Sequence, residues 1–221
     1  MIAAVASVEP DEVSAALAAC LAVERARAGA SVLLADAGPG ARCRDWLAAR
    51  AAARLRPCPG GADLGLAAEP AAVETALDRC DALVIDAGRC RRALIAADVA
   101  IVPVAPAAAD PDRDYDLVAA LNAARIFNPG LHVLFLTVAD GDAADPADPA
   151  GMRRGLARVR GYAAEVLSAH VADTVVPRAA LCGARPGACA ADDATGMPPW
   201  LDALCHAAFG TLSARRRWPV Y

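Results

Sequence analysis

Aromatic side chains are scarce in this sequence of 221 residues, where they make up 4% of the chain. Proteins that bind single-stranded nucleic acid stack bases on such side chains, so we do not expect that class of function. Basic residues are not in excess either, because the formal net charge is −4 at pH 7. An acidic chain is a poor candidate for binding the phosphate backbone of nucleic acids.

Two further patterns are missing, a metal-binding cysteine spacing and a membrane-spanning run. None of the eight cysteines forms a C-x-x-C pair and the three histidines lie far apart, so we expect no metal site. No uncharged apolar stretch reaches about 18 residues, and no basic segment precedes an apolar run at the N-terminus. We therefore expect a cytoplasmic protein without a transmembrane segment, whose thiols are reduced and mostly buried.

Short apolar runs alternate with segments of helical periodicity along the whole chain. We expect strands over residues 1–7, 31–35, 81–85, 99–104, 131–138 and 173–176. We expect helices over residues 12–28, 45–55, 70–79, 91–97, 115–127, 152–170 and 198–214. Prolines and glycines predict an irregular stretch over residues 56–65. The alternation predicts a single α/β domain over residues 1–221, a three-layer α/β/α arrangement around a mostly parallel twisted sheet.

Polar side chains stand where three of the predicted strands end. Ser7 follows the first apolar run, Asp36 the second and Asp86 the third. In open parallel sheets, ligands bind beyond the carboxyl ends of the strands. These positions are therefore the first candidates for a functional site.

Several segments match a known order of motifs. The strand IAAVAS is followed by VEPDEVSA, a helix and SVLLADAGPG, and later come DALVIDAG (81–88), IVPVAP (101–106), ARIFNPGLHVLFL (124–136) and VVPRAALCGARPGA (175–188). Together they resemble the ParA/MinD family of deviant Walker P-loop ATPases over nearly the whole chain, with DALVIDAG similar to the Walker B segment. The resemblance implies a P-loop NTPase-like (SIMIBI/ParA-like) fold.

The loop after the first strand departs from the family pattern K-G-G-x-G-K-[ST]. Glu9 stands at the signature lysine, Pro10 and Asp11 at the first two glycines, Val13 at the third glycine, Ser14 at the Walker lysine and Ala15 at the hydroxyl residue, with Glu12 between them. A P-loop needs glycine and backbone N–H groups to wrap phosphates, and proline has no N–H. The acidic side chains also repel a triphosphate. We expect no nucleotide cofactor, and we interpret these acids as caps of the following helix.

Asp36 and Asp86 stand where the family has aspartates that act on the attacking water and on Mg²⁺. Without a phosphate or metal we interpret them as vestigial, each capping the loop that follows its strand. Retained catalysis is the alternative. The family's adenine-reading asparagine would be expected near Thr137 and is not there.

The resemblance implies a role in positioning: partition, polar placement or a secretion-associated task. The altered loop predicts a pseudo-ATPase, not an enzyme, that works through a protein partner such as an intact ParA-like ATPase or a secretion or partition component. A homodimer not bridged by ATP is compatible with this hypothesis. One alternative is an active ATPase with an atypical P-loop, in plasmid or chromosome partitioning or in cellulose or conjugation machinery.

A second alternative is a DNA-binding partition factor without nucleotide control. It would depend on basic side chains in two segments, Arg153, Arg154, Arg158 and Arg160, and Arg215, Arg216 and Arg217. Solvated helix faces explain both clusters more simply, so we expect nucleic acid not to be the partner.

Overall fold

A parallel sheet forms the centre of the computed structural model, which describes residues 1–8, 11–37, 40–65, 68–139, 149–182, 185–192 and 197–210. Its strands are β1 (Ile2–Ala6), β2 (Val32–Asp36), β3 (Gly60–Asp63), β4 (Ala82–Gly88), β5 (Val99–Val104), β6 (His132–Ala139) and β7 (Ala169–Pro177). The seven strands are ordered β3-β2-β4-β1-β5-β6-β7, and the neighbouring pairs run parallel.

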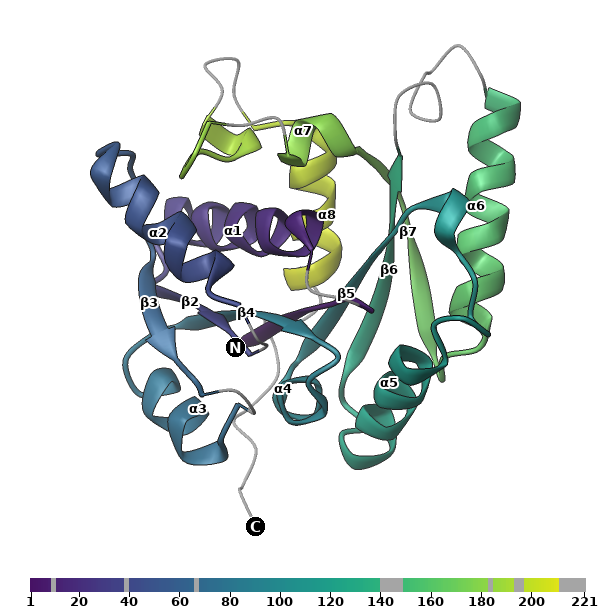
Figure 1. Ribbon diagram of the computed structural model, residues 1–221, viewed down its shortest axis with the longest axis horizontal. Helices are drawn as coiled ribbons and strands as arrows, with labels where there is room; N and C mark the ends of the chain where they lie inside the picture. Colours follow the sequence, from purple (N-terminus) through teal and green to yellow (C-terminus); the bar gives the residue numbers. More distant parts are fainter. Residues whose placement is uncertain are drawn as a thin grey trace.

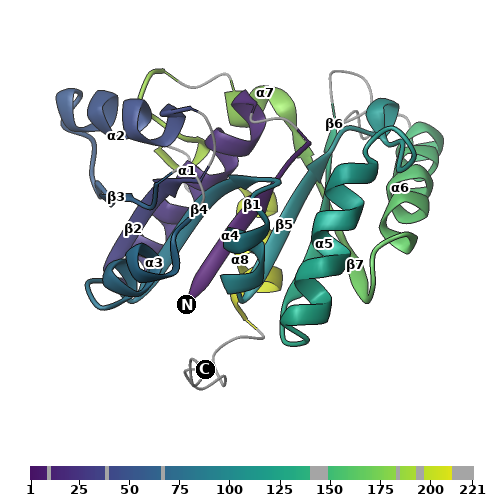
Figure 2. The same cartoon turned by 60° about the horizontal axis from the view of Figure 1, so that its bottom comes forward.

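Helices cover both faces of the sheet (Figures 1 and 2). They are α1 (Glu12–Arg27), α2 (Arg42–Ala52), α3 (Pro70–Leu77), α4 (Arg91–Ala96), α5 (Tyr115–Phe127), α6 (Pro149–Ala164), α7 (Arg178–Cys182) and α8 (Pro199–Phe209), with short 3-10 turns at Pro106–Ala108 and Ala190–Asp192. One core lies under α1, α2, α7 and α8, and the other under α3, α4, α5 and α6. This confirms the predicted three-layer α/β/α fold.

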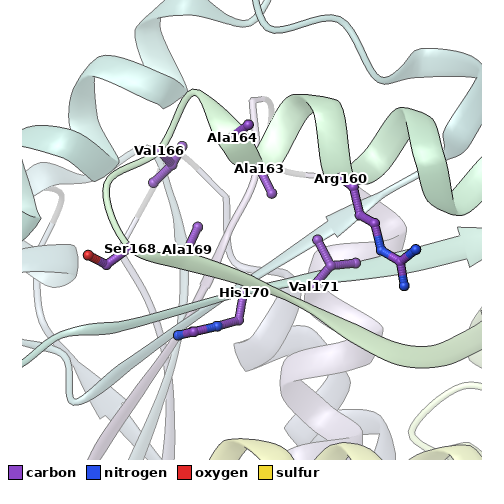
Figure 3. Close-up of a pocket in the computed structure, with 8 residues that line it drawn as sticks. All are labelled: Arg160, Ala163, Ala164, Val166, Ser168, Ala169, His170 and Val171. Carbon is purple, nitrogen blue, oxygen red and sulfur yellow. The ribbon is translucent and has the colours of Figure 1, made fainter.

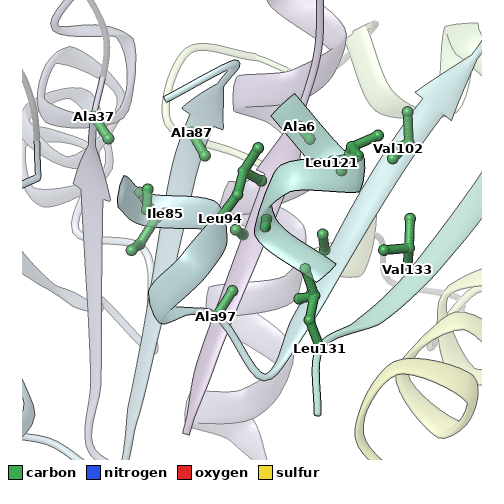
Figure 4. Close-up of a cluster of buried hydrophobic side chains, with 14 of the residues drawn as sticks. Ala6, Ala37, Ile85, Ala87, Leu94, Ala97, Val102, Leu121, Leu131 and Val133 are labelled. Carbon is green, nitrogen blue, oxygen red and sulfur yellow. The ribbon is translucent and has the colours of Figure 1, made fainter. Parts of the chain in front are cut away.

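Alternating side chains of each strand feed the two cores. In β1, Ala3 and Val5 face the core under α1, whereas Ile2, Ala4 and Ala6 face the other. Figure 4 shows part of the second core, where small alanines lie among larger leucines and valines. Because alanine adds little bulk, the helices can approach the sheet closely while water is still excluded.

The strand β3 corrects the prediction of an irregular stretch over residues 56–65. It pairs in parallel with β2, from Leu33 opposite Gly60 to Asp36 opposite Asp63. A Cβ on Gly60 would lie 2.7 Å from the Leu33 side chain, so a larger residue there would require the end of that side chain to move. A strand of this kind has no apolar alternation to reveal it, because tertiary pairing rather than propensity defines it.

Several element boundaries also differ from the prediction. The helix expected over 152–170 ends at Ala164, and β7 begins at Ala169 after a turn in which Ser168 has a φ of 52°. The third strand continues beyond Asp86 to Gly88. The last helix is described to Phe209, so residues 211–214 and the arginines at 215–217 lie outside the described residues. No helix in the described ranges has the length and apolar character needed to cross a membrane.

Candidate site at the carboxyl ends of the central strands

Three neighbouring strands bring the predicted polar residues together. Asp36 of β2 and Asp86 of β4 are register partners, and Asp86 is also opposite Val5 of β1. The Ser7 N–H, just beyond β1, donates to the Gly88 carbonyl at 3.0 Å. Ser7, Asp36 and Asp86 therefore lie at the same edge of the sheet, as the sequence predicts.

The N-terminus of α1 is closed by the chain's own side chains. The Ser14 N–H donates to Asp11 Oδ1 at 2.7 Å, and the Asp11 N–H donates to Ser14 Oγ at 3.4 Å, which makes a reciprocal capping box. Glu12 adds a carboxylate to the first turn. The interpretation of these acids as helix caps is thus confirmed for Asp11, whereas Glu9 and Pro10 lie outside the described residues.

Asp36 caps a second helix. Its Oδ1 accepts a hydrogen bond from the Cys43 N–H at 3.0 Å, and its Oδ2 accepts one from the Arg44 N–H at 3.3 Å. The residue at the N-cap position of α2, Ala41, has no side-chain acceptor to offer. Asp36 therefore satisfies the first-turn donors of α2 from the end of β2, and its predicted capping role is confirmed.

Asp86 lies beside Asp36, but it is more deeply buried and less fully hydrogen-bonded. It is 5% exposed, and its Oδ1 has no hydrogen-bond partner among the described residues. Burial raises the pKa of Asp86 to about 6, with further contributions from the charges of Asp36 and Asp11, while the Ser14 hydroxyl and Arg42 oppose the rise. The capping role predicted for Asp86 is not confirmed, because no backbone N–H in the described ranges reaches this oxygen.

Cys43, in the first turn of α2, completes the group. The ligand atoms of Asp36, Cys43 and Asp86 all lie within 4.8 Å of one another. Burial raises the pKa of the Cys43 thiol far above its ordinary value, and the nearby charges of Asp36 and Asp86 add to the rise. Cys43 belongs to no C-x-x-C pair, and its only signal in the sequence is its place shortly after Asp36.

One further predicted residue, Thr137, and one predicted basic cluster contribute little chemistry. Thr137 of β6 is buried, and its hydroxyl has no hydrogen-bond partner within the described part of the chain. The arginines predicted as a possible basic face, Arg153, Arg154, Arg158 and Arg160, are exposed on α6. Arg160 is 3.8 Å from Asp173 in an exposed ion pair, which offsets part of that charge.

A shallow pocket of about 380 Å³ lies elsewhere, at the amino-terminal end of β7 (Figure 3). Its lining consists of Arg160, Ala163, Ala164, Val166, Ser168, Ala169, His170 and Val171. Because the strands are parallel, this pocket lies at the edge of the sheet opposite Asp36 and Asp86. It offers few convergent polar groups, so the carboxyl edge remains the candidate site.

Known proteins resemble this chain in structure but not in sequence. No family model and no curated protein matches the chain. Cobyrinic acid a,c-diamide synthase from Mycobacterium smegmatis, solved with a bound ATP analog and magnesium, is 19% identical with a TM-score of 0.61 over 95% of this chain and 96% of that chain. The fold is that of the ParA/MinD-type P-loop ATPases.

Two more structures of this ParA/MinD type align over most of the chain. A chain of the MinC:MinD cell division protein complex of Aquifex aeolicus is 15% identical, with a TM-score of 0.61 over 100% of this chain and 99% of that one. Apo McdA of Cyanthece is 16% identical, with a TM-score of 0.54 over 93% of each chain. In this fold the segment between β1 and α1 takes the position of the P-loop, which is where the Asp11 cap lies.

Proposed function

We propose that this chain is a ParA-like pseudo-ATPase, which binds and positions other proteins and does not hydrolyse ATP. The observation that carries the proposal is the capping box at the N-terminus of α1. In a P-loop protein, the first-turn N–H groups of this helix hold phosphate. Here the Ser14 N–H already donates to the Asp11 carboxylate.

Negative charge at the N-terminus of α1 further disfavours phosphate binding there. Asp11 and Glu12 are both exposed in the first turn of α1, and no lysine stands at the Walker position, which Ser14 takes. Two unit charges about 5 Å apart at an effective dielectric constant of about 20 repel by roughly 3 kcal/mol. A single such interaction lowers the affinity for a polyanion by about a hundredfold.

One observation favours a second function, an active ATPase with an atypical P-loop. Asp36 and Asp86 are adjacent at the strand ends, as an Mg²⁺-dependent hydrolase of this fold would need. The structural neighbour from Mycobacterium smegmatis was solved with an ATP analog and magnesium bound. The two functions differ in a simple measurement, since only the ATPase is stabilised by the nucleotide.

The test is a thermal-shift and calorimetric titration of the full chain with millimolar ATP and Mg²⁺. We expect no stabilisation of the wild-type protein, because a ligand raises the apparent stability only when it binds the folded state. The Asp11→Asn variant keeps a capping side chain but removes its charge, and we expect it to show weak binding at most. A strong Mg²⁺-dependent stabilisation of the wild type by ATP, lost in Asp86→Asn, would identify the chain as a nucleotide-dependent enzyme.

The proposed partner is a protein, either an intact ParA-like ATPase or a component of a partition or secretion system. The structure of MinD in complex with MinC supports this choice, because that neighbour with the same fold assembles with another protein. Any homodimer would form without bridging ATP. Sedimentation with and without ATP tests this point, and we expect the same oligomeric state in both conditions.

A further inference from the structure

Asp36, Cys43 and Asp86 form a compact set of potential metal ligands from three elements. Two carboxylates come from the adjacent ends of β2 and β4, and the thiol comes from the first turn of α2. Their ligand atoms lie within 4.8 Å of one another, and the side chains of Cys43 and Asp86 are buried. A single ion at the centre of this set could contact all three.

A second, independent observation is the buried carboxylate oxygen of Asp86 that has no hydrogen-bond partner in the described ranges. Asp86 is only 5% exposed, and no hydrogen-bond donor in the described ranges reaches its Oδ1. Buried carboxylates in proteins are paired with a cation, hydrogen-bonded or coordinated to a metal. A second carboxylate, that of Asp36, lies beside Asp86, and the Ser14 hydroxyl and Arg42 offset the burial of its charge only in part. A positive ion would satisfy the unpartnered oxygen and offset the repulsion.

One ligand is already held in place by the fold. Asp36 accepts hydrogen bonds from the Cys43 and Arg44 N–H groups, which fix the orientation of its carboxylate. Such outer contacts orient the ligands of known metal sites. The bond that orients Asp36 also ties it to the backbone of Cys43, so two of the three ligands are positioned as a unit.

We propose that Asp36, Cys43 and Asp86 bind one Zn²⁺-class transition-metal ion, with water at a fourth position and no nucleotide. A thiolate ligand selects a softer ion than Mg²⁺ or Ca²⁺, which prefer oxygen-only sets. Zinc bonds of about 2.0–2.3 Å require the ligand atoms to approach more closely than the 4.8 Å upper limit seen here. Rotation of the Asp86 side chain, whose Oδ1 is not held by a hydrogen bond in the described ranges, can supply that closure.

This site goes beyond the proposed function and differs from the Mg²⁺ arrangement that the family resemblance implies. It contains a protein thiolate and needs no phosphate oxygen. Its failure would leave the ATP titration described above unaffected, and an ATP-binding result would leave the metal titration unaffected. The metal site and the pseudo-ATPase function are therefore tested by separate measurements.

The test is a Co²⁺ titration of chelator-treated full-length protein in a phosphine reductant without nucleotide. We expect one equivalent to bind with an intense near-ultraviolet thiolate-to-cobalt charge-transfer band, which Zn²⁺ displaces and excess Mg²⁺ does not. Cys43→Ser should abolish the band. Asp86→Asn, which keeps the thiol and the side-chain shape, should keep the band but weaken binding about tenfold or more.

Matched controls come from two cysteines outside the group, Cys58 and Cys90, which are partly exposed. Cys58→Ser and Cys90→Ser should bind Co²⁺ as the wild type does, and circular dichroism should confirm that every variant is folded. A band that survives in folded Cys43→Ser, or that disappears in either control, would overturn the proposal. So would the absence of a band in the wild type, or equal competition by Mg²⁺.

Discussion

The helix α2 carries two buried polar groups that differ sharply in how they are satisfied. Near its C-terminal end, Arg50 is fully buried and forms a closed network with Asp192. At its N-terminal end, Cys43 lies against Asp36 and Asp86, two carboxylates of the same charge. The same helix therefore joins a complete polar cluster to an incomplete one.

The Arg50 network leaves little unsatisfied. Arg50 donates to both carboxylate oxygens of Asp192, at 2.7 and 2.9 Å, and to the carbonyls of Pro57 and Gly187. Burial alone would raise the pKa of Asp192, but hydrogen bonds from Arg50 and from the Cys189 N–H lower it to about 2. The carboxylate stays ionised and links α2 to the segment after α7.

This difference separates a structural cluster from a candidate functional one. A complete buried network fixes one arrangement of the chain, whereas an unpartnered buried carboxylate costs stability. Proteins tolerate that cost mainly where a ligand relieves it. The comparison makes Asp86, and not Asp192, the residue whose environment calls for a ligand, and mutations at the two clusters should shift stability in opposite directions.

The largest effect is expected from Arg50→Leu. The substitution leaves Asp192 with much of its hydrogen bonding lost, and breaking a buried pair in this way costs about 3 kcal/mol of unfolding free energy. Urea denaturation followed by circular dichroism measures the change. Arg89→Leu is the matched control, because its ion pair with Asp116 is exposed and such pairs contribute about 0.5 kcal/mol. Equal losses in the two variants would contradict the distinction drawn here.

The second largest effect is a gain in the free energy of unfolding, opposite to the loss expected for Arg50→Leu. In the presence of a chelator, Asp86→Asn should stabilise the protein at pH 7 by about 2 kcal/mol, because a pKa of about 6 makes the ionised form unfavourable in the folded state. The folded pKa is above the unfolded one, so wild-type stability should fall as the pH rises from about 4 through about 6.

Urea midpoints measured across this pH range test the expectation for Asp86. Asp86→Asn should remove the component of the pH dependence that Asp86 contributes, while Asp36→Asn serves as the comparison because its oxygens already accept two hydrogen bonds. A loss of stability in Asp86→Asn at pH 7 would show that the carboxylate has a partner in the folded protein.

The smallest effect is expected at the N-terminus of α1. Asp11→Ala removes the capping acceptor of the Ser14 N–H and should cost about 1 kcal/mol. Glu12→Ala in the same turn removes a charge but no capping bond of the box, so its cost should be a few tenths of a kcal/mol. Thermal and urea unfolding compare the two. An equal cost would mean that charge, not the hydrogen bond, stabilises this end.

An apolar run followed by an aspartate predicted where Asp36 and Asp86 lie along the sheet, although β4 continues past Asp86 to Gly88. Asp36 and Asp86 could therefore be placed side by side from pattern alone, given a parallel sheet. The pattern could not reveal Arg50, because a charged residue in a helix is expected in water and its partner Asp192 is remote in sequence. Cys43 was missed for the same reason, since only the folded chain brings it to the two carboxylates.

The order of the strands has a consequence for how the chain reaches this structure. β1 lies at the centre of the sheet, yet its hydrogen-bonding neighbours β4 and β5 come far later in the sequence. During synthesis, its apolar segment must leave the ribosome well before either neighbour exists. Sheets that depend on such distant pairings fold slowly, and their apolar segments stay exposed and prone to aggregation in the meantime. Protection of the nascent chain by a chaperone should therefore raise the yield of folded protein.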